Sequence, residues 1–92
     1  MKAPRQKTKM AVTVKYRGEL ALITRIAAEQ IEAANVKDVL RHIKTRYGAS
    51  AAQQAKTMLI AVNGQSILLL GRFRTALQNA DEVSFLPICS GG

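Results

Sequence analysis

The last two residues, Gly91 and Gly92, are the best candidates for chemistry in this chain. Neither has a side chain, so together they form a thin, flexible cord that can enter a narrow channel. Their terminal carboxylate is a poor acyl donor until its oxygen is converted into a good leaving group. We predict that the Gly92 carboxylate is the reactive group and that a flexible tail threads it into a partner. This tail comprises Ile88, Cys89, Ser90, Gly91 and Gly92.

The rest of the sequence offers no second reactive group. Cys89 and His42 are the only cysteine and histidine, so an internal disulfide and a four-ligand zinc site of these residues are excluded. There is no convincing catalytic triad, metal cluster or phosphate-binding loop, and we predict that the chain itself holds no metal or cofactor. We interpret Cys89 as a small apolar tail residue rather than a functional thiol, and His42 as a surface residue. The sequence leaves open whether the chain counts as an enzyme.

The composition indicates one small domain. With 92 residues, 48% of them hydrophobic and only 4% aromatic, the core must consist mainly of aliphatic side chains. The formal net charge is +8, and residues 1–9 hold four basic residues and no acid, which predicts a basic, disordered arm. A solubilising arm is favoured over a nucleic-acid-binding one. No apolar run is long enough for a signal peptide or a membrane span, so we expect a cytoplasmic protein.

The first third of the chain predicts two strands. Residues 10–16 alternate between apolar and polar, as in a strand with one buried face. Residues 20–26 are apolar without clean alternation, which suggests an irregular loop with a helical turn. Residues 29–34 form a weak second strand, with Ile31 as its best inward anchor.

The middle of the chain contains the clearest helix. Asn35 is a good N-cap, and Asp38 completes a capping-box pattern with a shorter acid. Apolar residues with helical spacing follow up to Tyr47, and Gly48 is well placed to end the helix in a left-handed conformation. Residues 49–56 suit a short helix or a loop.

The last third predicts a hairpin and a final strand. Alternation over residues 58–62 indicates a strand, and Asn63-Gly64 is a strong hairpin signal before a short return strand at 65–68. Residues 69–77 are an excursion, in which we expect Phe73 to anchor the loop on the core. The strand 82–87 should end at Pro87, which has no N–H to donate.

An apolar patch beside the tail is expected to bind partners. If the strands alternate as predicted, Leu59 and Leu86 lie on the outer face of the sheet, next to the tail. We assign partner docking to Leu59, Phe85, Leu86 and Pro87, although Phe85 should also point towards the core. The alternative is that the loop 69–77 covers this patch.

Three motifs resemble a known family. They are Asn63-Gly64, Asp81-Glu82-Val83 and the ending Phe85-Leu86-Pro87-Ile88-Cys89-Ser90-Gly91-Gly92. With them, residues 10–92 resemble the small, sulfur-carrying subunit of molybdopterin synthase, in the ubiquitin-like β-grasp sulfur-carrier family. The resemblance implies an α+β fold, with a mixed sheet of four to five strands packed on one main helix and the first and last strands parallel at its centre. The domain would then span residues 10–87, between the arm 1–9 and the tail 88–92.

The resemblance also implies a function. A ubiquitin-activating-like adenylyltransferase would use ATP to adenylate Gly92. A sulfur donor such as a cysteine desulfurase or a rhodanese would then convert it to a thiocarboxylate. The large molybdopterin synthase subunit would finally accept the tail, and the sulfur would pass to a pterin precursor. The alternatives are a sulfur carrier for thiamine, cysteine or tRNA thiolation, a ubiquitin-like protein modifier and, less favoured, a basic nucleic-acid-binding module.

The sequence departs from the pattern of related carriers at two places. Their last turn often reads Asp-Gly-Asp-Glu, whereas this chain has Asn79-Ala80-Asp81-Glu82. Because Asn tolerates a positive φ, we expect Asn79 to take over the role of the glycine. Ile88 follows Pro87 where a second proline often precedes the tail.

Overall fold

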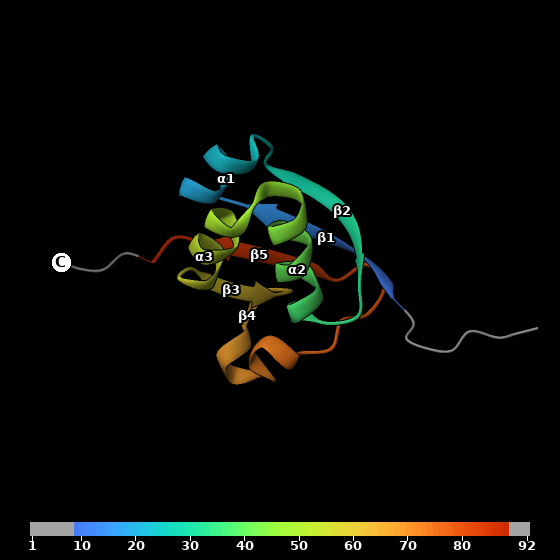
Figure 1. Ribbon diagram of the computed structural model, residues 1–92. Coiled ribbons are helices and arrows are strands. Elements are labelled where there is room, and N and C mark those ends of the chain that lie inside the picture. The colour runs from blue at the N-terminus through green and yellow to red at the C-terminus, as the bar shows by residue number, and fades with distance from the viewer. Residues whose placement is uncertain (1–8, 89–92) are drawn as a thin grey trace, which may run out of the picture.

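The computed structural model describes residues 9–88 as two layers, a mixed sheet and a set of helices that covers one of its faces (Figure 1). The strands are β1 (Met10–Tyr16), β2 (Ala28–Ala33), β3 (Leu59–Val62), β4 (Gln65–Ser66) and β5 (Glu82–Leu86). The α-helices are α1 (Gly18–Thr24), α2 (Val36–Tyr47) and α3 (Ala49–Lys56). Two 3₁₀ turns, η1 (Ile67–Leu69) and η2 (Arg72–Arg74), follow β4. The predicted α+β class is confirmed.

The first and last strands lie side by side at the centre of the sheet. Its strand order is β2-β1-β5-β3-β4, and β1 and β5 run parallel, with Val14 opposite Val83 and Tyr16 opposite Phe85. The strands that flank this pair, β2 and β3, are each antiparallel to their central neighbour. The central parallel pair that the family resemblance implied is therefore present.

Alternation along the strands separates a buried face from an outer face. In β1, Val12, Val14 and Tyr16 are buried against the helices, whereas Thr13 and Lys15 point to the other side. Val83 and Phe85 bury the same face of β5. The helices contribute Leu20, Val36, Val39, Ile43, Ala51 and Ala55 to this core. Burial of each large aliphatic side chain stabilises the fold by about 1.5–3 kcal/mol.

Helix α2 begins as predicted but ends differently. The Asn35 side chain accepts a hydrogen bond of 2.9 Å from the Asp38 backbone N–H, and Asp38 Oδ2 accepts one of 2.8 Å from the backbone N–H of Ala34. Gly48 follows the helix with φ 103° and ψ 166°, which is not the expected left-handed helical conformation. It is an extended conformation that only glycine adopts readily. Gly48 thereby turns the chain directly into α3.

The helical layer is larger than expected. The helical turn expected within residues 20–26 belongs to a regular helix, α1, over Gly18–Thr24, so the expected irregular loop is wrong for most of this stretch. Residues 49–56 form α3 over their full length. Leu20 and Thr24 are buried four residues apart on one face of α1, while Leu22 is 75% exposed. An apolar residue on the solvent side therefore hid the helical period. Strand β2 begins at Ala28 and β3 at Leu59, each one residue away from its expected start.

The hairpin forms at the predicted dipeptide, but its second strand is short. Asn63 and Gly64 both have positive φ, as a tight hairpin turn requires. Strand β4 ends at Ser66, and the expected strand residues Ile67 and Leu68 belong instead to η1. The Ser66 hydroxyl explains this change, because it accepts a hydrogen bond from the Leu68 backbone N–H and starts the 3₁₀ turn.

Two of the motifs that carried the family resemblance meet at the start of β5. Asn63 Nδ2 donates to Asp81 Oδ1 and Asn63 Oδ1 accepts from the Glu82 backbone N–H, each at 2.9 Å. In the preceding turn the expectation for Asn79 is wrong, since Ala80 has the positive φ of 72°. The Asn79 side chain instead accepts a hydrogen bond of 3.0 Å from the Ala11 backbone N–H. Both turns fix the end of β5 that lies opposite the tail.

Candidate functional site

The root of the tail lies at the end of the central strand β5. The strand ends at Leu86, as the proline at position 87 predicted, and Ile88 is 61% exposed. Pro87 packs against Gly18, where a Cβ atom would come within 3.3 Å of Pro87 Cγ. Gly18 also has φ 58°, a backbone conformation that favours glycine. Glycine at this position thus allows both the backbone conformation and the close contact with Pro87. Cys89, Ser90, Gly91 and Gly92 lie outside the described residues.

Leu59 and Leu86 form an apolar patch on the outer face of the sheet at the tail end. They are opposite each other in the β3–β5 pair; Leu59 is 37% exposed and Leu86 is half-buried. The outer face becomes polar away from the tail, at Ser84 and Lys15. An apolar pair on an otherwise polar face suits contact with a partner.

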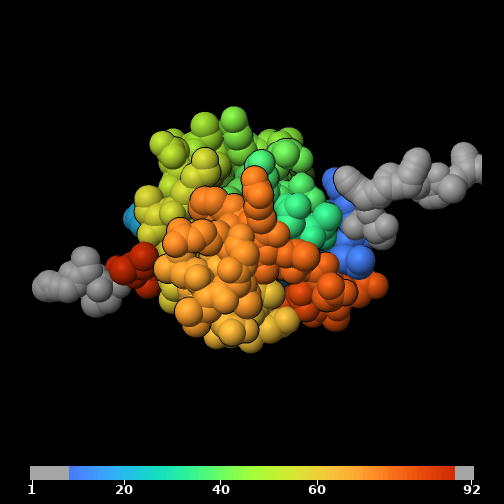
Figure 2. Space-filling view, turned by 90° about the horizontal axis from the view of Figure 1, so that it is seen from below, coloured from blue at the N-terminus to red at the C-terminus, as the bar shows by residue number. Residues whose placement is uncertain are grey.

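The loop after β4 extends this patch rather than covering it. A hollow of about 220 Å³ is lined by Leu59, Leu68, Phe73 and Ile88, among others. The η1–η2 segment lies below the sheet in Figure 1, and Figure 2 shows it in orange facing the viewer, with the red root of the tail at the left. Phe73 is 40% exposed, so the expectation that it anchors the loop on the core is wrong. The buried apolar residues of the chain between β4 and β5 are Ile67 and Leu77.

One residue assigned to docking lies elsewhere. Phe85 is fully buried, where it stacks with Tyr16 at a ring separation of 6.2 Å. Alternation along β5 turns it to the helix side, so it supports the patch from beneath and cannot contact a partner in the folded domain. Pro87 is exposed, and Leu59 and Leu86 have the expected positions on the outer face. We define the docking patch as Leu59, Leu86, Pro87 and Ile88.

A polar cluster is centred on Glu29, which no sequence pattern marks as a site. Glu29 Oε2 accepts hydrogen bonds from the Tyr16 hydroxyl, the Tyr47 hydroxyl and His42 Nε2, the last at 3.0 Å. His42 is thus half-buried in a network rather than a free surface residue. These partners are 13 and 18 residues from Glu29 in sequence, so no local pattern signals the cluster.

The cluster changes the acidity of its members. Burial alone raises the pKa of Glu29, but the hydrogen bonds from Tyr16, His42 and Tyr47 outweigh it, so that the pKa lies below its usual value. Burial, and then the hydrogen bond to the Glu29 carboxylate, raises the pKa of Tyr16 and of Tyr47. The cluster links β1, β2 and α2 through side-chain hydrogen bonds, so we interpret it as structural.

Residues 9–88 contain no group of three or more His, Cys, Asp or Glu side chains arranged to hold a metal ion. In this same part of the chain, no helix is both long and apolar enough to cross a membrane.

The sheet order, the helical layer and the tail root define a ubiquitin-like β-grasp protein. Residues 14–92 match the sequence profile of the ThiS family, and the chain belongs to that family. It is therefore a ThiS-like sulfur carrier or small modifier. The profile match runs through Gly91 and Gly92.

Solved structures of similar proteins agree in fold. The small archaeal modifier protein 1 of Methanosarcina acetivorans is 25% identical with a TM-score of 0.80, over 94% of this chain and 100% of that one. In the Amycolatopsis orientalis BexX/CysO complex, the matching chain is 21% identical with a TM-score of 0.75, over 89% and 100% of the two chains. In the complex of subunits 1 and 2 of Helicobacter pylori molybdopterin-converting factor, the matching chain is 23% identical with a TM-score of 0.66, over 90% of this chain and 100% of that one. No curated protein sequence matches this chain. Members of this fold thus form complexes with partner proteins.

Proposed function

We propose that this chain is a sulfur carrier for molybdopterin biosynthesis in the cytoplasm, and that its Gly92 carboxylate carries the sulfur. The observation that carries the proposal is the family match through Gly91-Gly92, on a fold that presents an apolar docking patch at the root of the tail. The Helicobacter pylori complex of similar fold, named as a molybdopterin-converting factor, supports this choice of pathway.

The chemistry begins with activation of the carboxylate. A Gly92 oxygen attacks the α-phosphorus of ATP in an adenylyltransferase, and pyrophosphate leaves. The terminal sulfur of a persulfide, supplied by a cysteine desulfurase or a rhodanese, then attacks the acyl carbon and displaces AMP. A second thiol cleaves the resulting acyl disulfide, is itself oxidised to a disulfide and leaves a thiocarboxylate on Gly92. ATP is bound by the activating enzyme and not by this chain.

The second stage moves the sulfur to its acceptor. The thiocarboxylate sulfur attacks a carbon of the pterin precursor in the large synthase subunit and displaces an oxygen-bound leaving group from that carbon, which forms a thioester. Water then hydrolyses the thioester, which leaves the sulfur on the pterin as a thiol and restores the Gly92 carboxylate. This attack needs close approach more than a catalytic group on the carrier. The folded body supplies the position and the tail supplies the access.

A protein modifier is the second candidate. The likeness to the small archaeal modifier protein 1, at a TM-score of 0.80, favours it. A lysine amine of a target would then attack the same adenylate and displace AMP, and an isopeptide bond would form at Gly92 in place of the thiocarboxylate. Sulfur carriers for thiamine, cysteine or tRNA thiolation would share the activation chemistry and differ only in the acceptor.

Intact mass spectrometry separates these functions. The chain is co-expressed with an activating enzyme and a sulfur donor, and fragmentation confirms that it ends at Gly92. Exchange of one oxygen for one sulfur at Gly92 supports the carrier, whereas covalent ladders on other proteins support the modifier. A chain that ends at Gly92 and shows neither change with a competent activating enzyme contradicts both. Sulfur transfer to a pterin precursor by the loaded carrier and a large synthase subunit then tests the pathway.

A further inference from the structure

The charge of this chain is strongly segregated along the sequence. Residues 39–80 contain no Asp or Glu but six Lys or Arg residues, and Lys37 lies just before them. This stretch forms most of α2 and all of α3, η1 and η2. The surface formed by α3, η1, η2 and the row of Lys37, Arg41 and Lys44 on α2 is therefore strongly positive. The one acid of α2 is Asp38, and Glu29 of β2 contacts α2 at His42 and Tyr47, outside this row. Asp38 is engaged in the cap of α2 and in a contact of 3.3 Å with Arg41.

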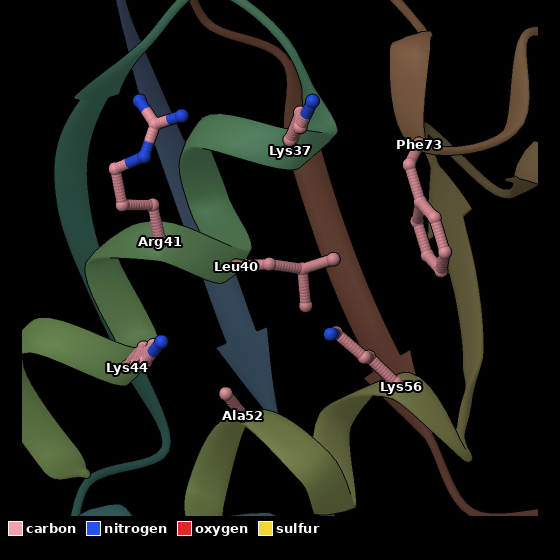
Figure 3. Close-up of a pocket in the computed structure, with 7 residues that line it drawn as sticks. All are labelled: Lys37, Leu40, Arg41, Lys44, Ala52, Lys56 and Phe73. Carbon is pink, nitrogen blue, oxygen red and sulfur yellow. The ribbon is translucent and has the colours of Figure 1, made fainter. Parts of the chain in front are cut away.

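A hollow of about 350 Å³ lies on this positive side, between α2, α3 and η2. Figure 3 shows Lys37, Arg41 and Lys44 on α2, Lys56 reaching in from the end of α3, and the ring of Phe73 opposite. Leu40 and Ala52 complete its lining. The hollow thus combines an apolar floor with a basic rim.

The hollow shares lining residues with two others. One of about 230 Å³ shares Lys44, Ala52 and Lys56 with it and continues along α3 to Gln53. The other shares Lys56 and Phe73 and is the hollow at the docking patch, which reaches Ile88. We call the two hollows between α2 and α3 the basic groove. It joins the root of the tail through Lys56 and Phe73.

We infer that the basic groove binds an acidic segment of a partner protein, which places an apolar side chain on Leu40, Ala52 and Phe73 and carboxylates against Lys44 and Lys56. Charge complementarity selects an acidic partner, and the apolar floor selects one with an apolar side chain between its acids. A second copy of the chain would bring like charges together on this side. A nucleic acid would need several stacking surfaces, and Phe73 is the single aromatic residue of the groove.

The position of the groove gives the contact a purpose. A partner that binds the basic groove and the docking patch at the same time contacts the domain on both sides of Lys56 and Phe73. The tail leaves the domain at that same end. Two adjacent weak contacts raise the effective concentration of each other, so even modest affinity in the groove would strengthen the binding of a partner that receives the tail. The inference does not require sulfur chemistry at Gly92.

Binding of defined peptides tests the inference. The probe is a fluorescein-labelled peptide in which one Leu is flanked on both sides by Glu residues in a Gly/Ser background, and fluorescence anisotropy measures its affinity for the full chain. We expect binding that weakens with added salt. We also expect weaker binding when the Leu is replaced by Ser, and none when every Glu is replaced by Gln. Equal binding of the Leu and Ser peptides contradicts an apolar floor contact.

A matched pair of variants tests the place of binding. Lys44 and Arg46 are both exposed in the last turn of α2, but Arg46 lines neither part of the groove. Lys44→Glu should lower the affinity for the Leu peptide by roughly fivefold or more, because it replaces an attraction by a repulsion. Arg46→Glu should change this affinity far less. Both variants change the net charge by the same amount in the last turn of α2, and circular dichroism checks that Arg46→Glu folds although Arg46 interacts with Tyr47. Equal weakening would mean non-specific attraction and would overturn the inference.

A second pair tests the floor of the groove. Phe73→Ala should remove the preference for the Leu peptide over the Ser peptide, whereas Leu69→Ala, at an exposed residue of η1 outside the hollow, should keep it. An unchanged preference in Phe73→Ala contradicts the assignment. A labelled single-stranded RNA serves as the competing ligand. If it binds more tightly than the Leu peptide and also loses affinity through Lys44→Glu, the groove is a nucleic-acid site instead.

Discussion

At the scale of single residues, Ala80 adopts a backbone conformation that glycine adopts more easily. Its φ is 72°, and its N–H donates to the Ala11 carbonyl at 2.8 Å, which ties the turn to β1. In related carriers, the pattern Asp-Gly-Asp-Glu places a glycine at this position. The hydrogen bonds of the turn impose this conformation on Ala80, and the resulting strain lowers the stability of the folded protein.

Ala80→Gly should therefore stabilise the protein by about 1 kcal/mol, because it removes the left-handed strain of a Cβ atom. Urea unfolding followed by circular dichroism measures this change. Ala76→Gly is the matched control, since Ala76 is exposed in the same loop and does not have a positive φ. The control should lose stability. A loss in both variants would contradict the strain at Ala80.

The Glu29 cluster makes stability depend on pH in a specific direction. The pKa of Glu29 is lower in the folded chain than in the unfolded one, so protonation favours unfolding. Its contribution is complete above the unfolded value of about 4.3 and is lost as the pH falls through the folded value. The pKa of Tyr16 and of Tyr47 is raised, so their contribution is present below an unfolded value of about 10 and is lost above it.

Glu29→Gln should lower stability at neutral pH and reduce the further loss in acid, because the variant has no carboxylate to protonate. The free energy of unfolding in urea, measured across the acid range below about pH 4.3, checks this. Glu32→Gln is the control on the same strand, at an exposed residue outside the cluster. An acid dependence in Glu29→Gln equal to that of the parent protein would show that the cluster does not set it.

At the scale of elements, two glycines with positive φ have different surroundings. Gly18 starts α1 and lies against Pro87 at the end of β5, so it joins the first helix to the root of the tail. Gly48 joins α2 to α3, and a Cβ atom there would meet nothing within 4 Å. Both demand glycine for the backbone, but only Gly18 also controls a contact beside the tail.

This difference predicts different effects of the same substitution. Gly18→Ala should cost about 1–2 kcal/mol of stability and Gly48→Ala about 1–3 kcal/mol, from backbone strain. At a temperature where both variants are folded, only Gly18→Ala should slow sulfur loading of Gly92, because the added Cβ displaces Pro87. Urea unfolding and intact mass spectrometry measure the two effects. Equal loading rates for the two variants would mean that the Gly18–Pro87 contact does not guide the tail.

At the scale of the whole molecule, the surfaces that suit a partner lie around one end of the sheet. The docking patch lies at the end of β5, and the basic groove reaches the same end through Lys56 and Phe73. The opposite end is closed by the Asn63–Asp81 contact and the turn at Ala80. This polarity suits a domain that presents its C-terminal tail to other proteins.

Leu59→Asp should leave the fold intact and slow loading by the activating enzyme on the order of tenfold, because it places a charge in an apolar contact. Leu69→Asp is the control, since Leu69 is 74% exposed and lies outside the docking patch. Initial rates of thiocarboxylate formation measure the effect. A Leu59→Asp protein that is folded and loaded at the parental rate would remove Leu59 from the docking patch.

Much of the fold could be predicted because the relevant signals are local. Alternation marks β1, the apolar spacing after Asn35 marks α2, and Asn63-Gly64 marks the hairpin. The outer-face position of Leu59 and Leu86 also followed, since alternation fixes the face of each residue, whereas their pairing across β3 and β5 came from the structure. Helix α1 could not be predicted in this way, because exposed apolar residues masked its buried side.

The sequence by itself determined the candidate for chemistry at Gly91-Gly92, the strand stop at Pro87 and the concentration of positive charge in residues 39–80, since each depends on residue type and order alone. Only the tertiary structure decided that Glu29 collects Tyr16, His42 and Tyr47, that Ala80 takes the positive φ, and that Phe85 is inaccessible. It also decided that Phe73 and Lys56 join the basic groove to the tail root. These features depend on contacts between elements far apart in the chain, and the packing of helices on the sheet selects those contacts.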